Sequence, residues 1–401
     1  MTAVDEETQA DEETQADEEA EETQAAAPSA RSWSWSWLTE LSTPLLVFSA
    51  SRVVQLLLLG WVEPGDATIK GRLLSWDGGW FIRVATEGYP HGYTYDEAGE
   101  LTANGLAFFP LYPMLIRGVH ALGADAGTAA LVISWLAAVA AVCLIYLLGV
   151  ELFDRRAAFA LTVLFATAPM SVVLSMAYTE SLFCALVLGM FYAARRNAYL
   201  VAGVLGFLAG LTRPTGLAAA VGLTVAAGLA VRRRTVPPWR PIAGALVALA
   251  GVPSYLLWVA VRVGDPAAWF KIQTAGWGTT FDWGGSTWDF LYVAFHQGEQ
   301  WVQVSVALII VVAVAAAILA VRRTWPPLVV YGLLALILVV GQAGYYHSKP
   351  RLLFPVLITL VPAACLAARS RPRAVALGLA AYAAFGLWYS AYLVAVWKYT
   401  I

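Results

Sequence analysis

A series of long apolar segments constrains the fold of this chain more than any other feature. The chain has 401 residues, of which 60% are hydrophobic and only 13% are charged, whereas a soluble domain carries about 25% charged residues. A helix that crosses a bilayer needs about 20 apolar residues. The apolar runs are residues 41–62, 127–150, 157–176, 178–194, 199–211, 215–231, 242–261, 301–321, 326–346, 352–368 and 374–397. This pattern predicts an all-α polytopic membrane protein with about 11 transmembrane helices, of which the two near residue 213 are short enough to be tilted, broken or re-entrant.

The N-terminal segment is acidic and repetitive. Residues 5–24 repeat the unit DEETQA, and residues 1–22 hold eleven acidic residues and no basic one. The net charge of −2 therefore reflects this segment, because the rest of the chain has 25 bases and 16 acids, a balance of +9. Such a sequence buries too little apolar surface to fold. We expect residues 1–40 to form a disordered acidic tail that ends in a tryptophan-rich interfacial segment, and residues 41–401 to form the membrane domain.

Arginine clusters follow the second, fourth, sixth, eighth and tenth apolar runs and therefore share one side of the membrane. The positive-inside rule makes that side cytoplasmic. With Arg31 and Arg240 it carries 14 of the 25 bases. Eleven spans then place the N-terminus inside and the C-terminus outside. The clusters are Arg155-Arg156, Arg195-Arg196, Arg232-Arg233-Arg234, Arg322-Arg323 and the group Arg369, Arg371 and Arg373.

The unusual polar motifs emerge on the opposite, outer side, which has two large loops at residues 63–126 and 264–300. The first loop contains an apolar stretch at residues 106–115 that two prolines interrupt. We expect this stretch to form helices that lie in the outer interface rather than cross the membrane. The expected location is the cell (plasma) membrane, with the active site on the extracytoplasmic face.

Asp77 is the first candidate for chemistry. It lies in Trp76-Asp77-Gly78-Gly79-Trp80, where the tryptophans would shield the carboxylate from water and the glycines would permit a tight turn and the close approach of a substrate. A carboxylate in this position could deprotonate an acceptor hydroxyl. The alternative is that Asp77 only caps a turn or a helix.

Two further charged residues lie in breaks between apolar runs. Glu180, in Tyr-Thr-Glu-Ser, begins a span; it is either a helix N-terminal acid that the helix dipole favours or a functional intramembrane acid. Arg213, in Thr-Arg-Pro-Thr-Gly, follows a helix end and could hold a phosphate oxygen. The alternative for Arg213 is an arginine that reaches the lipid headgroups.

His347, Lys349 and Arg351 form the densest cationic cluster on the outer side. They could bind the phosphate of a lipid carrier, or they could anchor the neighbouring spans at the interface. Asp282, in Phe-Asp-Trp-Gly-Gly, echoes the Asp77 motif and is its main rival, while Asp289 and Glu299 are weaker rivals.

Other chemistries are not indicated. The three cysteines, Cys143, Cys184 and Cys365, fall inside apolar runs and suit small core residues. The sequence has no Walker motif, no dinucleotide fingerprint and no zinc-type spacing of His and Cys. We expect no metal site, no cofactor and no nucleic-acid partner.

In these motifs the chain resembles the family of the second mannosyltransferase of GPI-anchor assembly and its bacterial relatives, within the multi-spanning GT-C glycosyltransferases. The resemblance covers roughly residues 41–400. The motifs that carry it are Trp76-Asp77 with Phe81 and Gly88-Tyr89, Phe108-Phe109-Pro110-Leu111, Tyr178-Thr179-Glu180-Ser181-Leu182-Phe183, Thr212-Arg213-Pro214-Thr215-Gly216, and His347 with Arg351-Leu352-Leu353-Phe354-Pro355.

The resemblance implies a GT-C-type helix bundle, a polyprenyl-phosphate mannose donor, inversion at the sugar carbon and usually no metal requirement. It also implies an aspartate in the first outer loop as the catalytic residue, which maps to Asp77. The family often has a basic residue or histidine near position 80, where this chain has Trp80, so contacts to the acceptor are expected to differ.

We therefore expect a membrane mannosyltransferase in which Asp77 is catalytic. Its partners would be polyprenyl-phosphate mannose, a lipid, glycan or protein acceptor, and membrane lipids. The alternatives are a transporter or flippase of lipid-linked sugars, which would need polar residues along the middle of the spans, and a structural membrane anchor. The residues expected to bind substrate or phosphate are Trp76, Glu180, Arg213, His347, Lys349 and Arg351.

Overall fold

The computed structural model describes residues 36–298, 300–397 and 399. The chain divides into two units, Met1–Ser42 and Thr43–Ile401, and the second contains the helix bundle. The acidic repeat, Trp33, Trp35 and Glu299 lie outside the described residues, so the expectations for them stay predictions.

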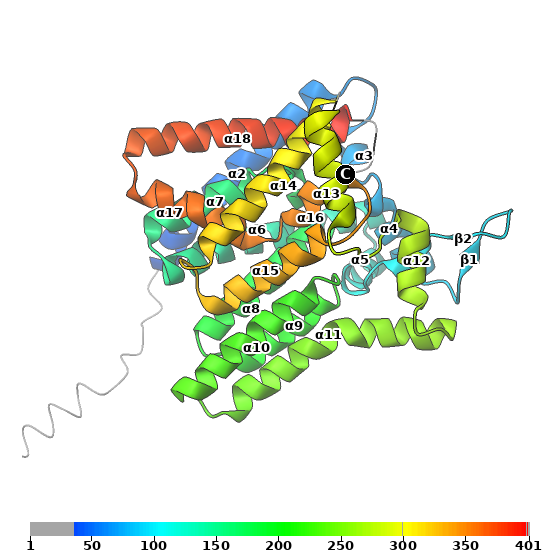
Figure 1. Cartoon of the computed structure of the whole chain (residues 1–401), viewed down its shortest axis with the longest axis horizontal. Helices are drawn as coiled ribbons and strands as arrows, with labels where there is room; N and C mark the ends of the chain where they lie inside the picture. The colour runs from blue at the N-terminus through cyan, green and yellow to red at the C-terminus, as the bar shows by residue number, and fades with distance from the viewer. Residues whose placement is uncertain (1–35, 299, 398, 400–401) are drawn as a thin grey trace, which may run out of the picture. The chain divides into compact units, whose positions relative to one another are not determined.

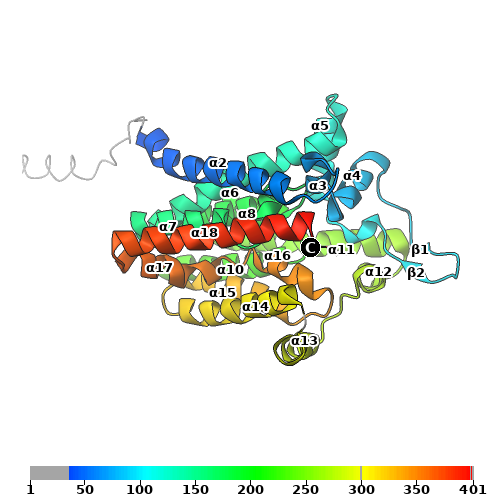
Figure 2. The same cartoon turned by 90° about the horizontal axis from the view of Figure 1, so that it is seen from above.

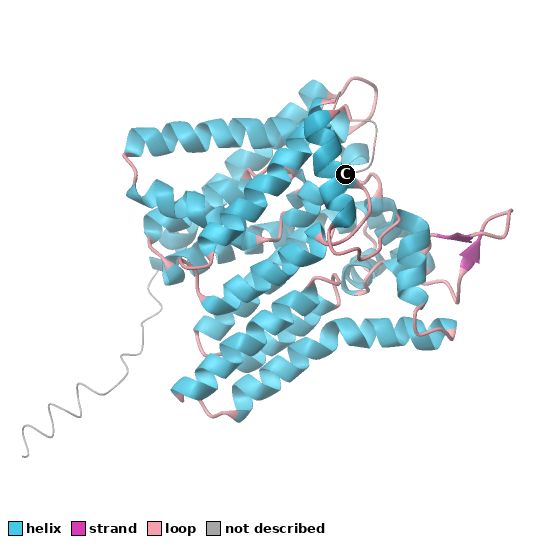
Figure 3. Ribbon diagram, in the orientation of Figure 1, coloured by secondary structure: helices cyan, strands magenta, loops and turns pink. Residues whose placement is uncertain are grey.

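Helices dominate the described residues (Figure 3), and six of them are long and apolar enough to cross a membrane. A seventh candidate consists of two helical pieces, Tyr346–Leu353 and Leu357–Arg369, bent by 78°. The fold class is therefore confirmed, whereas a count of eleven full crossings is not. The six are α2 (Ser36–Val62), α6 (Ala126–Leu152), α10 (Gly216–Arg233), α11 (Trp239–Val263), α14 (Trp301–Ala320) and α18 (Pro372–Ala395).

The remaining apolar runs form shorter or broken helices for local reasons. Proline lacks a backbone N–H group and clashes with the preceding turn of a helix. Pro169 follows the end of α7 (Arg155–Ala166), and Pro355 separates α16 (Lys349–Leu353) from the next helical turn. The other pieces are η2 (Ser171–Leu174), α8 (Glu180–Arg195), α9 (Tyr199–Gly210), α15 (Pro326–Val340), η3 (Tyr346–Ser348), η4 (Leu357–Leu360) and α17 (Val361–Arg369).

The first large loop contains short helices, as the sequence predicts, and one small hairpin that the sequence does not predict. The second large loop contains two helices for which the sequence analysis makes no prediction. Strands β1 (Thr94–Tyr95) and β2 (Leu101–Thr102) pair antiparallel. In the apolar stretch of the first loop, helix begins only after Pro110, at α5 (Leu111–Ala121). The other loop elements are α3 (Ile69–Leu73), α4 (Asp77–Glu87), η1 (Gly105–Ala107), α12 (Ala268–Trp277) and α13 (Gly285–His296).

The two ends of the bundle differ in character. α8 begins at Glu180 and ends at Arg195, and its 16 residues span ~24 Å. α10 likewise begins after Thr215 and ends in an arginine cluster. In both views α4, α12 and the hairpin lie toward one end of the bundle, and α7 and α17 toward the other (Figures 1 and 2). The polar motifs and the arginine clusters thus lie at opposite ends of shared helices.

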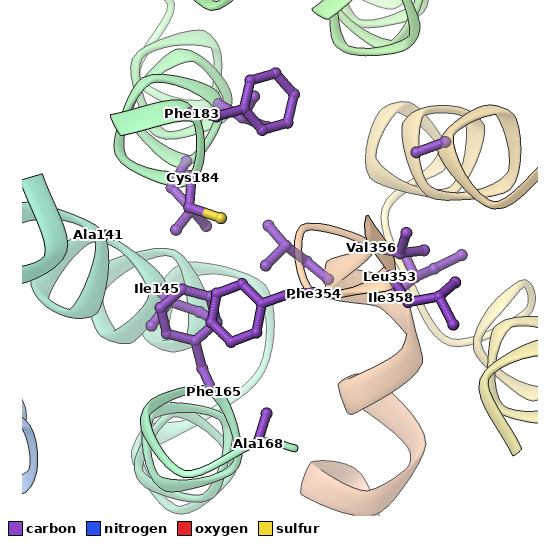
Figure 4. Packing of buried hydrophobic residues seen from close by; sticks show 14 of the residues in the cluster. Ala141, Ile145, Phe165, Ala168, Phe183, Cys184, Leu353, Phe354, Val356 and Ile358 are labelled. Atoms are coloured by element: carbon purple, nitrogen blue, oxygen red, sulfur yellow. The ribbon is translucent and has the colours of Figure 1, made fainter. Parts of the chain in front are cut away.

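The core of the bundle fixes the broken segment that carries Arg351. Phe354, three residues after Arg351, packs against Phe165 of α7 with ring centroids 4.8 Å apart. Ile145 and Cys184 lie beside this pair in the same buried cluster (Figure 4). Because these side chains come from α6, α7 and α8, the break is held against three helices.

Helices α9 and α11 meet along a seam of small residues, which lets their backbones approach closely. Helices α9, α10 and α11 pack side by side (Figure 1). A Cβ atom added to Gly203 of α9 would lie 2.6 Å from Cα of Gly244 of α11. A Cβ atom on Gly206 would lie 2.7 Å from Cβ of Ala248. The seam therefore has no room for even one extra methyl group.

We predict that Gly203→Ala lowers the stability of the bundle, because the new methyl group forces α9 and α11 apart. Overpacking of this kind costs about 1–3 kcal/mol. Gly228→Ala is the matched control, since a Cβ atom at Gly228 of α10 meets nothing within 4 Å. Thermal unfolding of the purified proteins in detergent should show a lower midpoint for Gly203→Ala only. Equal midpoints for the two variants would contradict the tight seam.

Candidate active site

A cavity of about 580 Å³ lies where the polar motifs meet. Its wall is built from α4, the segments that lead into α8 and α10, α12, and the chain between α15 and α16. The tertiary fold thus brings together motifs that are far apart in the sequence. Of the seven residues that the sequence predicts for the site, five line this cavity: Asp77, Glu180, Arg213, Lys349 and Arg351.

Asp77 is the first residue of α4, and a strained residue precedes it. Trp76 has φ 54°, in the left-handed region that favours glycine. The expected tight turn is therefore at Trp76, because Gly78 and Gly79 are already helical. The side chain of Trp76 packs against the main core and is not among the residues that line the cavity. Trp76 therefore packs into the core beside the site instead of lining the cavity.

Two ion pairs place four charged side chains at the cavity, and we call these four residues the ion-pair cluster. Nη1 of Arg351 lies 2.6 Å from Oδ2 of Asp77. Nη1 of Arg213 lies 2.5 Å from Oε1 of Glu180. Nε of Arg351 also lies 3.8 Å from Oε1 of Glu180, so Arg351 joins the two pairs. The side chain of Glu180 is 1% exposed, those of Arg213 and Arg351 are 12% exposed, and that of Asp77 is 21% exposed.

The chain places Glu180 and Arg213 next to each other through two helix ends. Glu180 begins α8, where a negative charge is stabilised by the helix dipole. Arg213 lies in the break between α9 and α10, which is sharp because Gly216 returns to Gly210: a Cβ atom on Gly216 would lie 2.6 Å from Cα of Gly210. Arg213 thus pairs with a buried acid rather than serving only as a headgroup anchor.

Tyr178 supports the cluster and was not among the predicted site residues. The guanidinium carbon of Arg351 lies 4.8 Å from the centre of the Tyr178 ring, in a cation–π contact. The backbone N–H of Asp77 donates to Oη of Tyr178 over 3.4 Å, which is a long hydrogen bond. Tyr178 therefore touches both members of the Asp77–Arg351 pair. In the sequence Tyr178 begins the motif Tyr178-Thr179-Glu180-Ser181-Leu182-Phe183, which carries part of the resemblance, but no charge marks it as a site residue.

Lys349 lines the cavity but already uses all three of its ammonium hydrogens. Its Nζ donates to Thr287 Oγ1 at 2.9 Å, to the carbonyl of Val339 at 3.0 Å and to the carbonyl of Gln342 at 2.7 Å. Lys349 thereby ties α13 to the end of α15 and fixes one wall of the cavity. The phosphate contact predicted for Lys349 requires one of these bonds to be released.

His347 lies beside the cavity rather than on its wall. Its ring is 6% exposed and stacks on Tyr345 and Tyr399, with ring centroids 5.4 Å and 5.8 Å apart. Among the described residues, the cavity lining contains Tyr345 but not His347. This arrangement favours a packing role for His347.

The rival acid Asp282 acts as a helix cap. Its carboxylate accepts the backbone N–H of Gly284 at 3.0 Å and that of Ser286 at 2.7 Å, and it accepts the Ser286 hydroxyl as well. The Ser286 hydroxyl bond, with the backbone bonds, holds the pKa of Asp282 below its ordinary value. Asp282 is not among the residues that line the cavity, and Asp289 is exposed on α13.

Metal ligands do not gather in the part of the chain that the structure describes. No group of three or more His, Cys, Asp or Glu residues there could hold a metal ion. Both acids of the ion-pair cluster are paired with guanidiniums.

We predict that Glu180→Ala strongly destabilises the fold, because it leaves the Arg213 charge buried and unpaired. Breaking a buried pair costs about 3–5 kcal/mol. Glu180→Ala combined with Arg213→Ala should recover part of the loss. The control is Glu151→Ala, which breaks the pair of Glu151 with Arg196, whose side chains are 24% and 48% exposed; such pairs contribute about 0–1 kcal/mol. Thermal unfolding of the four proteins in detergent measures the difference, and equal losses for Glu180→Ala and Glu151→Ala would refute it.

The sequence of this region matches a known family. Residues 62–229 match the model of the family described as Mannosyltransferase (PIG-V). The matched segment contains Asp77, Glu180 and Arg213. Among curated proteins, none matches the chain.

Solved structures with a similar fold are membrane glycosyltransferases of the GT-C class. ArnT from Cupriavidus metallidurans in the apo state is 18% identical with a TM-score of 0.51, and the match covers 85% of this chain and 63% of that one. The structure of the same protein bound to undecaprenyl phosphate is also 18% identical with a TM-score of 0.51, and the match covers 88% of this chain and 64% of that one. The Archaeoglobus fulgidus oligosaccharyltransferase tethered with an acceptor peptide is 14% identical with a TM-score of 0.50, and the match covers 89% of this chain and 56% of that one.

These identities establish similarity of fold alone, and the chain spans less than two thirds of the length of each of these structures. The match to the mannosyltransferase (PIG-V) family covers residues 62–229, which is less than half of the chain. Residues 62–229 of the chain are therefore similar to the mannosyltransferase (PIG-V) family, and the fold of the chain is similar to that of the GT-C membrane glycosyltransferases.

Proposed function

We propose that this protein transfers mannose from a polyprenyl phosphate to a hydroxyl group of an acceptor, with inversion at the sugar carbon. The observation that carries the proposal is the Asp77–Arg351 ion pair on the cavity wall, with N and O atoms 2.6 Å apart. The family description supplies the sugar. A structure of the same fold bound to undecaprenyl phosphate supports the kind of donor.

The lining of the cavity suits a lipid-linked sugar phosphate. One part of the wall carries the ion-pair cluster. Another part carries aromatic side chains, three of which are also exposed: Phe270 at 56%, Phe281 at 45% and Tyr345 at 51%. A ligand with a charged phosphate and a hydrocarbon tail matches this change from charged to apolar surface.

Asp77 is placed to act as the general base. Only Oδ2 is bound by Arg351, and among the described residues none forms a hydrogen bond to Oδ1. Oδ1 can therefore accept the proton of an acceptor hydroxyl. The acceptor oxygen then attacks the mannose carbon from the face opposite the phosphate, and a single displacement of this kind inverts the configuration.

The arginines of the cluster act on the leaving group. The departing phosphate gains negative charge as its bond to the sugar breaks, and Arg213 and Arg351 present guanidinium N–H groups at the cavity that can hold its oxygens. Lys349 would assist only after release of one of its three bonds. Glu180 keeps Arg213 in position.

We also propose that the cavity opens on the extracytoplasmic face of the cell membrane. The arginine clusters lie at the far ends of the helices that begin at the cavity, and such clusters face the cytoplasm in most membrane proteins. The acceptor would then be a lipid, glycan or protein at that face.

We predict that Asp77→Asn abolishes mannose transfer in proteoliposomes supplied with polyprenyl-phosphate mannose and acceptor. Loss of a general base lowers the rate by about 10²–10⁴-fold. The matched control is Asp282→Asn. Asp282 lies in a similar sequence motif but caps a helix outside the cavity lining, so this variant should keep wild-type turnover. Product is measured by mass spectrometry on proteins whose folding is checked by thermal unfolding. Wild-type turnover by Asp77→Asn would remove Asp77 from the reaction, and lipid translocation without sugar transfer would support a flippase.

We also propose that transfer needs no metal ion. The cluster holds two acids and two guanidiniums, so a divalent cation at the cavity would meet two positive charges already in place. Transfer by the purified protein should therefore persist in excess EDTA. Loss of activity in EDTA, with recovery on addition of one divalent metal, would contradict this proposal.

A further inference from the structure

We propose that Arg351 exchanges partners during the reaction: it leaves Asp77 when Asp77 takes the acceptor proton and binds the departing phosphate instead. This inference rests on the proposed function and extends it. It assigns to one side chain the coupling between deprotonation of the acceptor and departure of the leaving group.

The geometry gives Arg351 this position. Its guanidinium lies 2.6 Å from Asp77 and 3.8 Å from Glu180, measured between N and O atoms. Both Asp77 and Arg351 line the cavity, so a phosphate there can approach the pair directly. The side chains of Asp77 and Arg351 are 21% and 12% exposed, and in such a poorly hydrated site an unbalanced charge is costly.

The reaction moves one negative charge across this pair. Before transfer, Asp77 carries one negative charge and the phosphodiester of the donor carries one. The O–H bond of the acceptor then breaks and its proton goes to Asp77, while a bond forms between the acceptor oxygen and the sugar carbon. The bond from that carbon to the phosphate oxygen breaks, and its electron pair stays on the phosphate. Asp77 is now neutral and the phosphate carries two negative charges, so the total is unchanged.

Arg351 is the cation that can follow the displaced charge. Its guanidinium stays in place without Asp77, because it also lies over the Tyr178 ring at 4.8 Å and near Glu180. Arg213 has a different partner, Glu180, which does not take part in the proton transfer. Its partner Glu180 is 1% exposed and keeps its negative charge throughout the reaction. Arg213 therefore serves as a constant phosphate ligand, and Arg351 as the ligand that becomes available when Asp77 is protonated.

A direct consequence concerns the binding of the lipid phosphate product. Asn has the shape of a protonated Asp, so Asp77→Asn holds Arg351 in its released state. We expect purified Asp77→Asn to bind undecaprenyl phosphate at least about tenfold more tightly than the wild type. The gain should vanish when Arg351→Gln is added, and Arg351→Lys should retain part of it. Binding is measured by titration of undecaprenyl phosphate into protein in detergent micelles, followed by calorimetry.

The double variant separates this exchange from simple relief of repulsion. Removal of the Asp77 charge favours an anion by itself, so a gain that persists with Arg351→Gln overturns the exchange, and so does the absence of any gain in Asp77→Asn. Asp282→Asn should bind like the wild type. Thermal unfolding verifies that each variant is folded, and Arg351→Lys provides a second reading if Arg351→Gln is unstable.

The same titrations distinguish failure of this inference from failure of the proposed function. A wild-type protein that binds no undecaprenyl phosphate contradicts the proposed donor class. A wild-type protein that binds it, with an Asp77→Asn variant that binds equally well and is inactive in transfer, contradicts only the partner exchange.

Discussion

The cost of placing four charges inside an apolar bundle is the constraint on which this site depends. Each charge is acceptable only because an opposite charge lies next to it. Glu180 is nearly inaccessible to solvent and pairs with Arg213, while Asp77 is the most exposed member of the cluster and pairs with Arg351. Because the Glu180–Arg213 pair is buried, its two charges stay paired and in place. The outer pair remains accessible from the cavity, and the chemistry is therefore assigned to Asp77 and Arg351.

Breaks in the helices are what allow this pairing. An uninterrupted helix satisfies its own backbone and projects its side chains along its length, whereas a helix end can present a charged side chain and free N–H groups at one point. Glu180 begins a helix, Arg213 lies between two, and Arg351 lies in a short piece that Pro355 ends. The short apolar segments are thus part of the site, since full crossings at these positions would separate the charges.

The sequence allows the prediction of a helical membrane protein and of five charged residues on the cavity wall. Apolar runs indicate helices directly, and charged residues in such surroundings are rare enough to stand out. The pairing itself was not predictable, because Asp77 and Arg351 are 274 positions apart and meet only through packing. Tyr178 lies in the motif around Glu180 but was not predicted as a site residue, since an aromatic residue in an apolar chain is usually a core residue. Lys349 donates hydrogen bonds to Thr287 of α13 and to Val339 of α15, and the helical Gly78 packs beside Ala177. These contacts likewise depend on neighbours that are distant in the sequence.

The glycine seam between α9 and α11 has a mechanical consequence. Two helices in backbone contact cannot slide or separate by small adjustments of side chains, because no side chains lie between them to adjust. We therefore expect α9 and α11 to move as one rigid unit, which ends at the break that carries Arg213. The wall made by α13 and the end of α15 is held differently, by hydrogen bonds such as those from Lys349 to Thr287 and to the carbonyls of Val339 and Gln342. The cavity thus combines one wall held by direct contact between helix backbones with another held by hydrogen bonds.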